Sequence, residues 1–228
     1  MGQFISLVMT AVLLSLSCGA AKEQGTAKAA FDAAFALCID VGLSPDARLA
    51  RLADARWTPL QNLPLAVEMK ALWDALRQSN PTGRDFARIL DRSRASARTF
   101  FEVHRNHLTY RVHKDFSGLL DVAAPRGTSA TDKTDGGECT FLSGADLPGP
   151  LPTGHLNAAG GSTKPLIRSR PYVTNATYPF LVRDADGRTW RVVMDVTEIE
   201  TTALSELVGH DFGLRNVLKI YLIPERAQ

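Results

Sequence analysis

The chain has 228 residues, of which 45% are hydrophobic and 22% are charged, and its formal net charge is +2. These values are close to the averages of globular proteins and exclude both an intrinsically disordered chain and a fibrous repeat. The small net charge also excludes a whole-molecule field that would attract nucleic acid, so we expect no nucleic-acid partner.

The first twenty or so residues have the pattern of an export signal. An uncharged apolar run, Phe4 to Leu16, is followed by small residues around Ala20 and Ala21. Such a run is too short to cross a hydrocarbon core of about 30 Å. We therefore expect residues 1–21 to be a removable signal peptide. Residues 22–228 are expected to form one periplasmic or secreted domain, with no transmembrane segment in the mature chain.

Cys18 leaves two alternatives open at the N-terminus. A cysteine at the end of an apolar leader is the lipidated position of bacterial lipoproteins, although the Ser-Leu-Ser sequence at 15–17 departs from their usual pattern. A diacyl anchor at Cys18 would hold the mature protein at a membrane. The N-terminal Met-Gly with Ser6 also fits the N-myristoylation pattern.

The two later cysteines, Cys38 and Cys139, predict a disulfide. Removal of Cys18 with the leader leaves an even pair in an oxidising compartment, which is the condition for a bridge. Closing a loop of about 100 residues would remove roughly 4 to 5 kcal/mol of unfolded-state entropy. The alternative is two separate buried thiols that pack as small hydrophobic side chains.

The first part of the body is predicted to be helical. Phe31, Phe35 and Cys38 recur at spacings of three and four, so Cys38 faces the core. Ser44 and Pro45 form an N-cap and first helical residue for the next helix. The four predicted helices cover residues 27–41, 45–56, 65–76 and 85–97.

From Thr99 onward, β-branched and aromatic residues with frequent turns predict strands. The clearest is a hairpin that turns at Asp184 to Gly187. The expected strands cover residues 101–104, 108–112, 119–122, 139–142, 178–182, 189–196 and 216–223, with a short helix over 201–208. This order predicts an α+β fold, with N-terminal helices (22–97) packed on one face of a C-terminal, mainly antiparallel twisted sheet (98–228). The Pro- and Gly-rich segment 147–164 is either a surface loop or a functional lid.

Three histidines within ten residues, His104, His107 and His113, are candidate metal ligands, since zinc needs about three such groups. On one strand His104 and His107 would point to opposite faces, whereas a turn between them would let them converge. Glu102 and His104 share a face of the expected strand and are the candidate catalytic residues, because a carboxylate that orients an imidazole is the start of an acid–base pair. No nucleophile accompanies them. The alternative is a set of exposed polar strand residues.

Arginines between residues 84 and 98 form a basic helical edge. Arg84, Arg88 and Arg92 repeat every four residues along this edge, a spacing that would suit an anionic ligand or a lipid headgroup. The interleaved Asp85 and Asp91 favour instead a solvated, partly ion-paired face. Lys164, Arg168 and Arg170 form a second, weaker basic group. The arginines of the edge are Arg84, Arg88, Arg92, Arg94 and Arg98.

The layout of a leader, an early helix that contains Leu37-Cys38 and a later lone cysteine in a β-rich half resembles small uncharacterised exported proteins of Gram-negative bacteria. The resemblance assigns no activity to particular residues, and we expect no cofactor. Because the sequence carries no complete catalytic, nucleotide-binding or metal-binding signature, we expect a non-catalytic module that binds another protein or an envelope component. The alternatives are a hydrolase or metal-dependent enzyme that uses Glu102, His104, His107 and His113, and a carrier of anions or lipids.

Overall fold

The computed structural model describes residues 26–78, 83–104, 109–123, 137–145, 165–208 and 213–225, which form an α+β fold, as predicted. The elements are a first helix over residues 26–39, α2 (Pro45–Asp54), β1 (Thr58–Pro59), α3 (Leu63–Gln78), α4 (Gly83–Val103), β2 (Tyr110–Val112), β3 (Gly118–Ala123), β4 (Gly137–Ser143), β5 (Leu166–Arg170), β6 (Val173–Arg183), β7 (Thr189–Ile199), α6 (Thr201–Val208) and β8 (Asn216–Pro224).

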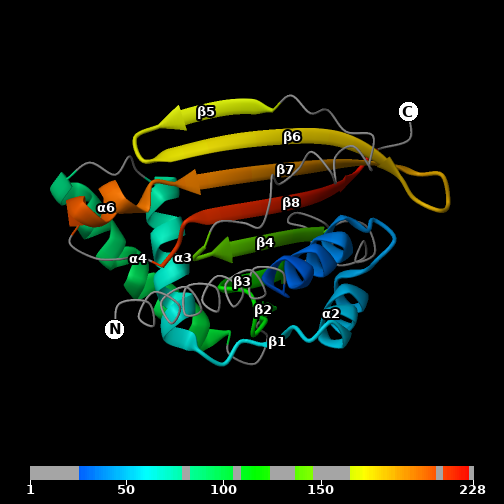
Figure 1. Ribbon diagram of the computed structural model, residues 1–228, viewed down its shortest axis with the longest axis horizontal. Coiled ribbons are helices and arrows are strands. Elements are labelled where there is room, and N and C mark those ends of the chain that lie inside the picture. Colours follow the sequence, from blue (N-terminus) through cyan, green and yellow to red (C-terminus); the bar gives the residue numbers. More distant parts are fainter. Residues whose placement is uncertain are drawn as a thin grey trace, which may run out of the picture.

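Eight strands form one sheet in the order β1-β2-β3-β4-β8-β7-β6-β5, and each neighbouring pair is antiparallel (Figure 1). The last strand, β8, lies in the middle, between β4 and β7. Residues directly opposite each other across a ladder share a face, so the register divides the sheet into two faces. We call the one that carries Cys139 the disulfide face, and the one that carries Asp121 and Lys219 the charged face.

The first helix and α2 pack on the disulfide face. Phe31 of the first helix lies against Phe141 of β4, with ring centroids 5.1 Å apart. The same core contains Phe35, Cys38 and the fully buried Trp57, together with the inward residues of β3, β4, β6, β7 and β8. The predicted apolar stripe of the first helix is therefore its buried face.

The other three helices cover one end of the charged face. Figure 1 shows α3, α4 and α6 gathered at that end of the sheet. Their apolar side chains form a second core with Leu119, Leu142 and Val217. The helices thus divide between the two faces of the sheet, whereas the sequence predicted them on one face. The rest of the charged face carries the ionisable side chains of Asp121 and Lys219 and also the exposed apolar side chains of Leu181 and Ile223.

The predicted helices and strands are confirmed where the local sequence signals were strongest. The Ser44 hydroxyl accepts a hydrogen bond from the Ala47 N–H at 3.2 Å and caps α2, which starts at Pro45. The predicted hairpin joins β6 to β7, and Gly187 takes the positive φ of 77° that its turn requires. The Asp184 carboxylate accepts hydrogen bonds from two backbone N–H groups of that turn.

The predicted strand over residues 101–104 is wrong, because α4 continues to Val103. Phe101 is buried in the second core, where its ring lies 5.0 Å from that of Tyr110. It continues the helical stripe of Leu90 and Ala97. The aromatic residues have only a weak intrinsic preference for strands, and burial on the helix outweighs it.

Two strands of the sheet were not predicted. β1 has two residues, Thr58 and Pro59, which pair with β2. β5 is exposed at all five positions, so it lacks the alternation of buried and exposed residues that identifies a strand in sequence.

Several predictions concern residues outside the described ranges: the signal peptide, lipidation at Cys18, the segment 147–164 and His107. Among the described helices, none is both long and apolar enough to span a membrane.

Candidate functional site

The candidate catalytic pair, Glu102 and His104, does not share a face. Both lie at the end of α4 rather than on a strand, and residues two apart on a helix point in different directions. Both are exposed, and the His104 ring lies 4.8 Å from that of Phe100. The prediction that the two residues share a face depended on strand geometry and is wrong for that reason.

His113 lies apart from α4, between β2 and β3, with its imidazole only 8% exposed. The ring packs on Trp57 with centroids 5.5 Å apart. Within the described ranges, which include His104 and His113 but not His107, no group of three or more His, Cys, Asp or Glu side chains is arranged to hold a metal ion.

The predicted disulfide joins Cys38 of the first helix to Cys139 of β4. Both cysteines are buried, at 1% and 2% exposure, and they close a sequence separation of 101 residues. The bridge ties the helix to a strand next to the middle of the sheet, so its role is structural.

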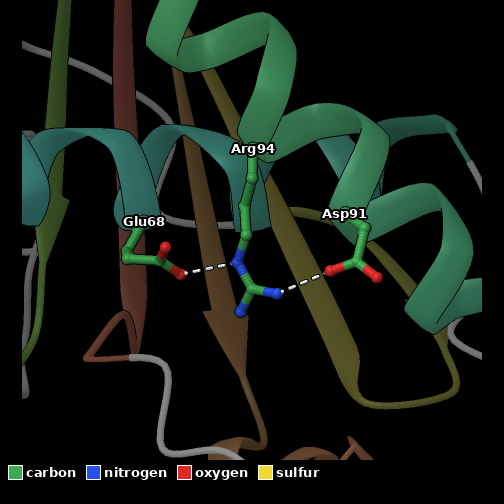
Figure 2. Close-up of polar contacts among 3 residues, drawn as sticks. All are labelled: Glu68, Asp91 and Arg94. Carbon is green, nitrogen blue, oxygen red and sulfur yellow. Dashed lines mark hydrogen bonds and ion pairs between the residues drawn. The ribbon is translucent and has the colours of Figure 1, made fainter.

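The arginine edge of α4 is partly ion-paired. Figure 2 shows Arg94 between two carboxylates: its Nε donates to Glu68 of α3 at 2.9 Å, and its Nη1 donates to Asp91 at 2.8 Å. Burial lowers the pKa of Arg94, but the hydrogen bonds and charges of Glu68 and Asp91 outweigh it and raise the pKa overall. Arg88 pairs with Asp85. Arg94 thus links α3 to α4, which supports the ion-paired alternative at that position, whereas Arg92 and Arg98 are exposed.

Ionisable and hydroxyl side chains lie in a row across the charged face. The register places Tyr110, Asp121, Thr140, Lys219 and Asp195 directly opposite one another on five adjacent strands. The sequence alone did not predict this row. The only sequence signal for the row is a polar residue on one face of each otherwise apolar strand. These polar residues can be seen to line up only when the register of the strands is known.

The members of this row are hydrogen-bonded to one another or to neighbours. Lys219 Nζ lies 2.6 Å from Glu138 Oε1, and both side chains are nearly buried. Thr109 donates to the Asp121 carboxylate, and Thr177 donates to Asp195. Each carboxylate of this network has a hydrogen-bond partner, and a satisfied buried polar network helps to specify one folded arrangement. The described contacts of the network do not indicate a ligand.

Asp121 should make stability depend on pH in a direction opposite to that of an ordinary salt-bridged carboxylate. Burial raises its pKa above 3.8; the Thr109 hydrogen bond opposes this shift, and the charge of Glu138 adds to it. A raised folded-state pKa gives stability that is fully present below the unfolded pKa and is lost as the pH rises through the folded pKa. Asp121→Asn should therefore gain stability relative to the wild type between about pH 4 and pH 7, by roughly 1.4 kcal/mol per unit of pKa shift. Urea unfolding of both proteins across this range tests it. A difference that does not change with pH would contradict it.

The outer edge of β5 is the described feature best suited to a partner. β5 pairs with β6 along Leu166–Arg170 and is the last strand of the sheet (Figure 1). Leu166 and Ile167 are 63% and 65% exposed. Arg168 and Arg170 form no ion pair with any described residue. Two residues of the second basic group thus lie on a strand that has no further neighbour strand among the described residues.

Comparisons with protein-family models, curated proteins and solved structures found no match to this chain, so its function has to be argued from the geometry of the described residues.

Proposed function

We propose that this protein is an exported, non-catalytic binding module that takes up an extended, acidic segment of a protein partner along the outer edge of β5. The observation that carries the proposal is the edge itself. Its five residues are all exposed, two of them are large apolar residues, and two are arginines without a described counter-charge.

An edge strand presents unpaired backbone N–H and C=O groups, which are a template for one more strand. Proteins usually protect such edges with charged side chains or proline, and β5 has exposed Leu166 and Ile167 beside its two arginines. Added strands bind through main-chain hydrogen bonds, and the alternating side chains supply specificity.

The side chains of β5 favour an acidic partner. Leu166, Arg168 and Arg170 alternate with Ile167 and Ser169, so the two arginines point to the same face. A peptide with carboxylates two residues apart would place one against each arginine. A second copy of this chain, paired antiparallel about Arg168, would instead put Arg168 opposite its own equivalent, and like charges directly opposite each other are destabilising.

Synthetic strands test the proposal. A fluorescently labelled peptide with the core Val-Glu-Val-Glu-Val is expected to bind the wild type, and its basic counterpart Val-Lys-Val-Lys-Val is not. The double variant Arg168→Glu/Arg170→Glu should lose at least about tenfold in affinity for the acidic peptide, equivalent to about 1.4 kcal/mol, and should now bind the basic one. Fluorescence anisotropy measures both affinities.

Two controls separate strand addition from simple charge attraction. Arg92→Glu/Arg98→Glu changes two exposed arginines on α4 by the same charge and should leave acidic-peptide binding unchanged. A peptide with proline at its centre has lost a backbone donor and should bind weakly. If the α4 variant loses affinity as much as the β5 variant, or the proline peptide binds equally well, strand addition at β5 is wrong.

The export part of the proposal rests on the leader and is supported by the disulfide, since such bridges persist in oxidising compartments. Mass spectrometry of native protein should find a mature N-terminus just after Ala20 or Ala21, and Cys38 linked to Cys139 without added oxidant. An intact Met1, or both thiols open to alkylation without a reductant, would contradict export.

A further inference from the structure

A cavity of about 300 Å³ lies between β1, the start of α3, the turn from β2 to β3, and Gly213 before β8. It is at the opposite end of the strand order from β5. Its volume is at the lower end of the range for small-molecule sites. A ligand there would be small.

The described residues that line this cavity include no Asp, Glu, Lys or Arg. Its polar groups come from Thr58, Gln61, Asn62, His113 and Ser117, and Leu65, Met69, Val112 and Phe116 supply apolar wall. Among the described lining residues a charged ligand would meet no opposite charge, and the loss of its hydration would be costly. The wall therefore favours an uncharged ligand that has both polar and apolar surface.

The polar side chains that line the cavity are suited to hydrogen bonding with the hydroxyl groups of a ligand. The amides of Gln61 and Asn62 and the hydroxyl of Ser117 each both donate and accept hydrogen bonds, as a ligand hydroxyl does. His113 Nδ1 accepts a hydrogen bond from the Asp115 N–H at 3.1 Å, which leaves the imidazole proton on Nε2 as a donor. Burial lowers the pKa of His113, with Asp115 opposing, and this shift favours the neutral ring.

We propose that this cavity binds an uncharged, hydroxyl-rich small molecule in the size class of a single sugar residue. The apolar side chains of Leu65 and Val112 pack against the C–H surface of such a ring, and the amides, hydroxyls and imidazole pair with its hydroxyls. The proposal is independent of strand addition, because the cavity shares no residue with β5.

NMR titration of the whole isotope-labelled protein tests the site. The neutral probes are D-glucose, N-acetyl-D-glucosamine and myo-inositol, and the charged probes are D-glucuronate and D-glucosamine. At least one neutral probe should give saturable shifts at the backbone amides of His113 and Ser117. Each charged probe should bind at least about tenfold more weakly than that neutral probe.

Two variants locate the binding. Gln61→Leu should weaken it at least about tenfold, and Gln78→Leu, which changes an exposed glutamine at the far end of α3, should leave it unchanged. Ser117→Ala provides a second, conservative change in the cavity and should also weaken binding. The proposal is overturned if no neutral probe gives saturable shifts at these amides, if a charged probe binds equally well, or if Gln61→Leu and Ser117→Ala both bind as the wild type does.

Discussion

Replacement of both Cys38 and Cys139 by alanine is expected to lower the free energy of unfolding by about 4 to 5 kcal/mol. The bridge closes a sequence separation of 101 residues, and the entropy that such a cross-link removes from the unfolded chain grows with the length of the loop. Small domains have only about 5 to 15 kcal/mol of net stability, so this is a large fraction of the whole. Urea unfolding of wild-type and variant proteins measures it.

Reduction provides the control for this prediction. A reductant should bring the wild type close to the stability of the double-alanine variant and should leave the variant itself unchanged. A loss below about 1 kcal/mol would mean that the unfolded chain is already compact or that the bridge strains the folded state.

Arg48→Met is expected to cost about 2 to 4 kcal/mol, because it removes hydrogen bonds from a charged donor to backbone carbonyls. Arg48 is fully buried. Its Nε donates to the Leu37 carbonyl at 2.8 Å, and its Nη2 donates to the carbonyls of Asp40 and Leu43 at 2.8 and 3.1 Å. These carbonyls lie at and just beyond the end of the first helix, where positive charge is favourable. Methionine keeps much of the apolar stem and loses the donors.

The matched control is Arg51→Met on the same helix. Arg51 is exposed, so its replacement should change stability by no more than about 0.5 kcal/mol. Arg48→Lys should be intermediate, because one ammonium group does not reproduce the planar fork of donors. If Arg48→Met and Arg51→Met unfold at the same urea concentration, the cap on the first helix contributes nothing.

Gly137 should couple to Arg48. A Cβ at Gly137 would lie 2.9 Å from Arg48 Nη1, so Gly137→Ala should destabilise the wild type. The same change should cost less in the Arg48→Met background, where the guanidinium is gone, and a double-mutant cycle measures the difference. Additive effects would show that the two positions do not interact. Gly137 is two residues from Cys139, so the arginine cap and the disulfide hold the same helix end against β4.

The parts of the fold that the sequence predicted are those with strong local signals. The helix over 26–39 and α2 follow from an apolar stripe and from the Ser44 cap. The β6–β7 hairpin follows from a turn that ends in glycine. The disulfide follows from the count of cysteines, because once Cys18 was assigned to the leader only one pairing remained.

The candidate sites were predicted less well. The Glu102–His104 pair required strand geometry, and the packing of Phe101 kept that segment helical. The sequence makes His113 a candidate metal ligand, and in the structure it lines a small cavity whose other described lining residues are neutral. Residue type alone identified these positions, but it did not show what surrounds them.

The sequence by itself determined which segments are helices or strands where an apolar period or a cap was present, and which two cysteines were available for the bridge. Tertiary structure alone decided the order of the strands, the division of the helices between the two faces, and the exposure of β5 at the edge. The reason is that helix periods and turns are set by residues close in the chain, whereas strand neighbours are set by pairing between distant residues. The placement of β8 between β4 and β7, which brings Lys219 to Glu138, has no local signal.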